Sequence, residues 1–176
     1  LLTAETTGQG NAGDVVINAD NRILFDNGAI FSTVAAGAVG DGGDIKIDTG
    51  TLSLADTILA ASTAGEGDAG NVLINAAGEF RAVDSDISTT AAQFSGGAIT
   101  ITARDIRLFS DSDIRTDVAS GAGGGGDITL TADAILAFDD SDILAFAQDG
   151  QGGNISLNTP AFFGENFRPN ANVTEP

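Results

Sequence analysis

The sequence contains no cysteine, histidine, methionine, tryptophan or tyrosine among its 176 residues. Without cysteine there is no disulfide framework, no thiol nucleophile and no cysteine-based metal site. The further lack of histidine excludes Ser/His/Asp and Cys/His catalytic sets. No apolar run approaches the roughly 18 residues that a membrane-spanning helix needs. We therefore expect no direct membrane insertion.

Positive charge is scarce as well. Seven Lys and Arg residues stand against 25 Asp and Glu residues, so the formal net charge is −18. Binding to nucleic acid or to anionic lipid needs a basic surface, and we expect neither partner. An acidic surface of this kind keeps an extended protein soluble and attracts divalent cations.

Glycine, by contrast, is abundant with 24 residues, whereas proline occurs only 3 times. This balance indicates many tight turns rather than a disordered linker. Hydrophobic residues make up 42% of the chain, enough for a buried core. The length corresponds to one domain.

A repeat runs through the whole chain. Six segments match the pattern Gly-[Asp/Asn/Ala]-[Val/Ile]-x-[Ile/Leu]-[Asn/Asp/Thr], and the intervals between their glycines are 30, 27, 27, 29 and 27 residues. Each unit holds three short runs that alternate apolar and polar residues, as half-buried strands do, and a glycine-rich loop closes it. The six segments are 13–18, 43–48, 70–75, 97–102, 126–131 and 153–158.

The repeat predicts an all-β fold, a right-handed parallel β-helix (β-solenoid) of about five to six coils, with roughly 27 residues and three short strands per coil. Coils stacked about 4.8 Å apart would pair each strand with its equivalent in the next coil. A βαβ fold would need helices of ten or more residues, which no amphipathic stretch supplies. An antiparallel sandwich would not need one fixed period. We assign residues 1–159 to the repeats and 160–176 to a C-terminal capping segment and tail.

The register of the second strand in each coil is open, because a slip of one residue exchanges the two faces of a strand. Either Ile106 and Leu108 or Arg107 and Phe109 point inward. We favour an inward column of Phe25, Phe109 and Phe138, interrupted by Ala82. For the third strand we predict an inward column of isoleucines, followed two positions later by small residues. These are Ile30, Ile58, Ile87, Ile114 and Ile143, and then Ser32, Ala60, Thr89, Thr116 and Ala145.

Both ends of the chain carry their own expectations. Residues 1–10 read as the tail of an earlier coil, so we expect the chain to be part of a longer protein, with upstream continuation or end-to-end packing. Near the other end, we expect Phe162, Phe163 and Phe167 to fold over the last coil as an apolar cap. Covering the end protects unpaired strand edges, which otherwise invite pairing with other chains.

The repeat also resembles a known family. Residues 10–19 read Gly-Asn-Ala-Gly-Asp-Val-Val-Ile-Asn-Ala, 56–63 read Asp-Thr-Ile-Leu-Ala-Ala-Ser-Thr, and 158–164 read Asn-Thr-Pro-Ala-Phe-Phe-Gly. These stretches are similar to the repeats of large secreted exoproteins with filamentous-haemagglutinin-like β-helices, especially the cyanobacterial haemagglutinin-like and S-layer-like members. The resemblance covers nearly the whole chain. It implies export through a partner outer-membrane pore (two-partner secretion) and a location outside the cell or on its surface.

The most suggestive polar feature is an Asp-Ser-Asp triplet that recurs between the second and third strands of three successive coils. Stacked carboxylates about 5 Å apart repel each other, and Ca²⁺, which prefers several carboxylate oxygens, would relieve that repulsion. The alternative is that Asp and Ser serve as turn residues facing solvent. The candidate metal ligands are Asp84, Asp86, Asp111, Asp113, Asp140 and Asp142.

Two further polar columns have a structural interpretation. We expect their side chains to hydrogen-bond the backbone at a corner, or to bond their own copies in neighbouring coils. One column runs Asp14, Asp44, Asn71, Asp127 and Asn154, with Ala98 breaking it, and the other runs Asn18, Asp48, Asn75, Thr102, Thr131 and Asn158. The run 123–126 is four glycines, but no Gly-Lys-[Ser/Thr] follows it, so it does not predict a phosphate loop.

Parallel β-helices also host enzymes that act on acidic polysaccharides, and paired carboxylates can hydrolyse glycosides. A catalytic pair is usually unique, however, whereas these aspartates recur coil after coil. Lyases need a basic group as well, and we expect Arg104, Arg107 and Arg115 to form surface ion pairs instead. We therefore predict no catalytic residues and no cofactor other than Ca²⁺.

The sequence favours a non-enzymatic structural or adhesive segment, a stalk or passenger, of a secreted cell-surface exoprotein. A carbohydrate- or Ca²⁺-binding β-helix module is the alternative, and a polysaccharide-acting enzyme comes third. The expected partners are surface polysaccharide, neighbouring exoprotein copies, or a second copy of the chain stacked end to end.

Overall fold

The computed structural model describes residues 1–120 and 123–164. That part of the chain consists of twelve β-strands joined by turns and contains no helix. A search of it for helices long and apolar enough to cross a membrane accordingly finds none.

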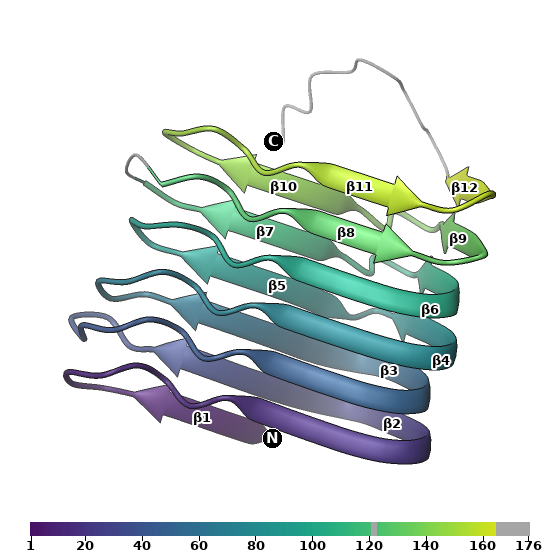
Figure 1. Cartoon of the computed structure of the whole chain (residues 1–176), viewed down its shortest axis with the longest axis horizontal. Coiled ribbons are helices and arrows are strands. Elements are labelled where there is room, and N and C mark those ends of the chain that lie inside the picture. The colour runs from purple at the N-terminus through teal and green to yellow at the C-terminus, as the bar shows by residue number, and fades with distance from the viewer. Residues whose placement is uncertain (121–122, 165–176) are drawn as a thin grey trace.

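The strands form a right-handed parallel β-solenoid of about six turns, with a coil spacing of about 28 residues. Figure 1 shows the coils stacked in chain order, with the N-terminus at one end of the stack. The strands are β1 (Leu2–Thr6), β2 (Val15–Val34), β3 (Ile45–Thr63), β4 (Val72–Val83), β5 (Asp86–Ala91), β6 (Ile99–Phe109), β7 (Ile114–Val118), β8 (Ile128–Thr131), β9 (Ala134–Ala137), β10 (Ile143–Ala147), β11 (Ile155–Asn158) and β12 (Phe162–Gly164).

Each coil covers three faces of the stack, which we call the first, second and third face after the order in which the chain runs over them. β2 and β3 each run over all three faces without a break. β4 and β6 cover the first two faces, and β5, β7 and β10 continue on the third. In the later coils β8 and β11 lie on the first face, and β9 and β12 on the second.

The core lies inside the stack, where equivalent side chains of successive coils meet. On the first face, Ile45 pairs with Val72 and Ile47 with Ile74, and the next coils add Ile99 and Ile101. All six are essentially inaccessible to solvent. Full burial of one such side chain contributes about 2 kcal/mol, so these ladders are the main reason that the coils stack.

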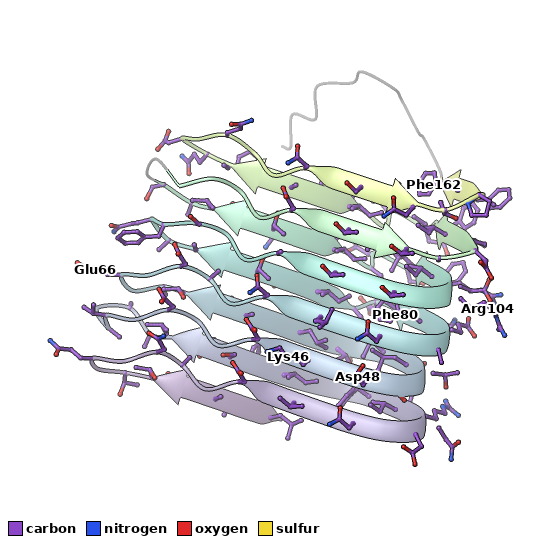
Figure 2. The ribbon with its side chains drawn as sticks, in the orientation of Figure 1. Lys46, Asp48, Glu66, Phe80, Arg104 and Phe162 are labelled. Carbon is purple, nitrogen blue, oxygen red and sulfur yellow. The ribbon has the colours of Figure 1, made fainter. Side chains whose placement is uncertain are left out.

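On the second face the predicted phenylalanine column is right for Phe25 and Ala82, which share an inward column, and wrong for Phe109 and Phe138. The inward column is Leu52, Phe80, Ile106 and Ile135, followed two positions later by Leu54, Ala82, Leu108 and Ala137. Phe25 belongs to the second of these columns, because it pairs with Leu54. Phe109 pairs with Val83 on the outside and stacks on Phe138, with 6.3 Å between ring centroids. Among the largest fully buried side chains of the described residues, Phe80 (labelled in Figure 2) is the only aromatic one, and the others are Ile and Leu.

On the third face the prediction holds in every coil but one. Ile30 pairs with Leu59 rather than Ile58, and Ser32 pairs with Ala61 rather than Ala60. Leu59 and Ala61 are fully buried, whereas Ile58 is 43% exposed. Three apolar residues in a row, Ile58-Leu59-Ala60, hide the alternation that sets the register elsewhere.

The small hydroxyl residues of the third face are buried for a reason that the sequence pattern alone does not give. Ser32, Thr89 and Thr116 donate to the carbonyl oxygens of Gly13, Gly97 and Gly126, at 3.0, 2.6 and 2.7 Å. An unpaired buried carbonyl is costly, so each hydroxyl satisfies a group that the glycine-rich turn brings inside the stack.

At the ends, β1 pairs with the third-face part of β2, with Leu2 beside Ile30. Residues 2–6 therefore form the third-face strand of a preceding coil, as the sequence predicted. Phe162 and Phe163 lie in β12, which pairs with β9 and continues the second face (Figure 2). These two residues therefore add a strand to the second face. Capping of the last coil stays a prediction, and Phe167 lies outside the described residues.

Candidate functional site

The glycine corner, as we call the turn that leads into the first face, holds a ladder of carboxylate and amide side chains. Asp14 Oδ1 accepts the amide N–H of Asp44 at 2.8 Å, and Asp44 Oδ1 accepts that of Asn71 at 3.0 Å. Asn71 Oδ1 accepts from Ala98, and Asp127 Oδ1 accepts from Asn154. Each side chain thus bonds the backbone of its own equivalent in the next coil, which confirms the structural interpretation of this column.

A second ladder runs beside the first one, three residues earlier in each coil. Asn11, Asp41 and Asp68 accept the backbone N–H groups of Asp41, Asp68 and Ser95, at 2.9, 3.1 and 2.9 Å. Sequence reasoning missed this ladder. The signal was present, since Asn, Asp or Ser precedes the corner glycine by two positions in four successive coils.

The glycines of this corner are required by the close approach of the coils. A Cβ atom on Gly70 would lie 2.0 Å from the carbonyl oxygen of Gly43, and one on Gly97 would lie 1.8 Å from that of Gly70. No side chain fits there without displacing backbone. In the run of four glycines, Gly126 follows the same logic, since its Cβ would lie 1.9 Å from the oxygen of Gly97.

Asp44 is the most strongly held carboxylate of the glycine corner. Partial burial by itself would raise its pKa, but the hydrogen bond from the Asn71 amide and the neighbouring Lys46 ammonium outweigh burial and lower the pKa below its usual value. Lys46 Nζ lies 2.9 Å from Asp44 Oδ2 and 3.8 Å from Asp14 Oδ2. Lys46 therefore partly compensates the charges of Asp14 and Asp44.

The aspartate corner, which we define as the turn between the second and third faces, carries its acids differently. Asn27, Asp56, Asp84, Asp111 and Asp140 occupy equivalent places there and all adopt positive φ angles, from 48° to 65°. Asn and Asp tolerate this left-handed conformation better than other residues with a side chain. The conformation explains why these residue types recur at the turn.

The serines between the predicted ligands form a buried hydroxyl ladder. Ser85 Oγ accepts the N–H of Thr57 at 3.1 Å, Ser112 Oγ that of Ser85 at 3.2 Å, and Ser141 Oγ that of Ser112 at 3.1 Å. Ser85 and Ser112 also donate to Val83 and Phe109 carbonyls. Ser85 and Ser112 are thus satisfied as donors and as acceptors.

Aspartates of this corner line an open hollow of about 460 Å³, to which Ser85 of the ladder also contributes. Four of the six predicted ligands, Asp84, Asp86, Asp111 and Asp113, line it together with Asp56, while Asp140 and Asp142 do not. Burial, together with the charges of Asp142, Asp86 and Asp111, raises the pKa of Asp113 despite the hydrogen bond from the Asp142 amide. The acids of this corner therefore repel each other.

In the described ranges, no three acidic side chains converge closely enough to hold a metal ion. The stacking of the two Asp columns is as expected, but the columns splay towards solvent. The assignment of Ca²⁺ to these aspartates stays a prediction.

The third polar column is bonded in two places. Asn75 Nδ2 donates to Asp48 Oδ1 at 2.9 Å, and Asn158 Nδ2 donates to Thr131 Oγ1 at 3.4 Å. Lys46 and Asp48 both project from the first face (Figure 2). These contacts link a coil to its neighbour, as expected for this column.

The predicted arginine ion pairs form for two of three residues. Arg104 Nε lies 3.0 Å from Asp105 Oδ2, and an Arg107 terminal nitrogen lies 3.3 Å from Glu79 Oε1. Arg115 borders the hollow of the aspartate corner, with no ion pair to a described residue.

The fold thus defines the class of the protein as a parallel β-solenoid. No protein-family model, curated protein or solved structure matches the chain.

Proposed function

We propose that this chain is a non-enzymatic structural and adhesive segment, a rigid stalk or passenger, of a secreted cell-surface protein. The proposal rests on one observation: the repeated polar side chains form hydrogen bonds between neighbouring coils. Side chains of the glycine corner bond the next coil, and serines of the aspartate corner bond the preceding one. Such side chains fasten the stack together.

The geometry of the stack supports a spacing role. Each coil contacts its neighbours, so a solenoid of this kind grows in one dimension as coils are added. Successive coils add about 4.8 Å each. The acidic surface keeps such an extended rod soluble.

Two measurements test the proposal: where the protein is found, and whether it still reaches that place after one coil is deleted. Antibodies against the chain should label intact cells of the source organism, or label protein released into the medium. Removing residues 70–96, one complete coil that keeps the register, should leave that labelling intact, because Gly97 then takes the place of Gly70.

A deletion of residues 70–82 is the matched control, since it breaks the register and should abolish display. Labelling seen only after the cells are permeabilised would refute the surface location. Loss of labelling after the in-register deletion, in a protein that still shows β-sheet by circular dichroism, would refute the spacer role.

A further inference from the structure

The second face carries most of the positively charged residues of this acidic molecule. Four of the arginines, Arg22, Arg81, Arg104 and Arg107, lie on the second face or at the turn that leads to it. Arg104 marks this side of the stack in Figure 2. A chain with a net charge of −18 thus gathers most of its few cations on one side.

Two of these arginines border a hollow of about 380 Å³ that spans three coils. Its lining is Arg22, Thr51, Leu52, Ser53, Glu79 and Arg81. Arg22 pairs in register with Thr51, and Ser53 pairs with Arg81. Thr51 and Ser53 of the middle coil therefore lie between the strand positions of Arg22 and Arg81, which belong to the coils on either side.

The charge on these two arginines is not neutralised by the described part of the chain. Arg104 and Arg107 have carboxylate partners at 3.0 and 3.3 Å, but neither Arg22 nor Arg81 has a described carboxylate within 4.0 Å. Glu79, the acid of the hollow, lies against Arg107 instead. Both Arg22 and Arg81 are exposed.

Arg81 is also held in place by an aromatic ring. Its guanidinium lies over the Phe109 ring, 5.6 Å from the centroid. A cation above an aromatic face is attracted to it, and a guanidinium stacked in this way keeps its N–H groups available in the plane. A ligand would therefore meet a partly preorganised donor group.

We propose that this hollow binds a carboxylated polysaccharide, a chain of uronic acid residues that lies across the coils. Guanidinium groups bind carboxylates through two parallel hydrogen bonds, so Arg22 and Arg81 would each take a carboxylate. Thr51 and Ser53 would bond sugar hydroxyl groups.

A sugar acid fits this lining better than a densely sulfated chain does. Hydroxyl groups and a carboxylate occur together on each uronate ring, and the lining offers hydroxyls beside guanidinium groups. Glu79 adds an acid to the hollow, which disfavours a ligand with several negative charges per ring. The inference goes beyond the proposed spacer role and does not depend on it.

The test measures binding of the whole chain to polygalacturonate by calorimetry, in EDTA at about 0.05 M salt, with neutral dextran and dextran sulfate as comparison polymers. The double variant Arg22→Gln/Arg81→Gln should weaken binding at least about tenfold, because each charge-assisted bond contributes substantially. The control Arg104→Gln/Arg115→Gln loses the same charge elsewhere and should change binding less than about twofold. Melting temperatures establish that both variants fold.

Selective binding of polygalacturonate, lost only in the Arg22/Arg81 variant, would support the proposal. No binding by the wild-type chain would overturn it. An equal loss in both variants would overturn it as well, because the effect would then be one of overall charge. Dextran sulfate binding equal to that of polygalacturonate would overturn the assignment to a carboxylated sugar.

Discussion

The glycine corner and the aspartate corner both stack acids along the solenoid, but they hold these acids in opposite ways. At the glycine corner, Asp44 accepts a backbone N–H from the next coil and lies 2.9 Å from Lys46. At the aspartate corner, Asp113 has other aspartates for neighbours, and their charges add to burial in raising its pKa. Aspartate thus stabilises the glycine corner, whereas charge repulsion among aspartates destabilises the aspartate corner.

The difference lies in where the coil-to-coil bonds are made. At the glycine corner the carboxylates and amides make these bonds themselves. At the aspartate corner the buried serines make them, and the neighbouring aspartates supply the positive φ angles of the turn. A recurring acid in a solenoid is therefore not by itself a sign of a ligand site.

The largest expected effect comes from filling the closest contact of the glycine corner. Gly97→Ala places a Cβ 1.8 Å from the Gly70 carbonyl oxygen, so the coils must separate there. We expect a loss of about 3 kcal/mol or more in unfolding free energy, measured by urea denaturation. Gly124→Ala is the control, because its Cβ meets only the Gln151 oxygen at 3.9 Å. Equal losses in the two variants would contradict the close-approach argument.

A smaller effect is expected from the hydroxyl ladder of the aspartate corner. Ser112→Ala leaves the Ser85 amide without its acceptor and the Phe109 carbonyl without its donor, and should cost about 1–3 kcal/mol. Ser88→Ala, on the outside of the third face beside Arg115, should cost less than about 0.5 kcal/mol. If thermal unfolding shows both serines to be equally dispensable, the ladder does not hold this corner.

The smallest effects should have opposite signs at the two corners. Asp44→Asn removes the ion pair with Lys46 and should lower stability at pH 7, while Asp113→Asn relieves repulsion and should raise it. Both residues are partly exposed, so each change should be about 0.5 kcal/mol. Both variants keep a side-chain oxygen to accept the backbone N–H of the next coil. Two shifts of the same sign in melting temperature would remove the contrast between the corners.

The pH dependence follows from the same two pKa shifts. The lowered pKa of Asp44 gives stability that is present above about pH 3.8 and is lost as the pH falls through the folded-state value. The raised pKa of Asp113 gives a penalty that is present at neutral pH and disappears as the pH falls towards 3.8. The advantage of Asp113→Asn over wild type should therefore vanish at pH 3, which melting curves at the two pH values would check.

Sequence reasoning predicted the coil, its period and the first-face columns, because six copies of one pattern give the same alternation each time. It failed where alternation is ambiguous. Ile106 and Phe109 are both apolar but lie on opposite faces of one strand, and apolar character alone does not say that Ile106 enters the core and Phe109 stays outside. Ile58 and Leu59 raised the same difficulty.

The candidate sites were predictable only in part. The stacked aspartates could be located from their repetition, but their left-handed backbone and the serine ladder depend on how the coils meet. The hollow between Arg22 and Arg81 was not predicted, because these residues lie 59 positions apart in the sequence. Only the register that places Thr51 and Ser53 between them brings them together.

The glycine-corner ladder is interrupted once, at Ala98. Asn71 still accepts the N–H of Ala98, but alanine has no side-chain oxygen that could accept the N–H of Asp127. The first run therefore ends at this residue, and another begins with the bond from Asp127 to Asn154. A pulling force along the axis should therefore open this junction before the junctions on its N-terminal side, where the ladder is intact.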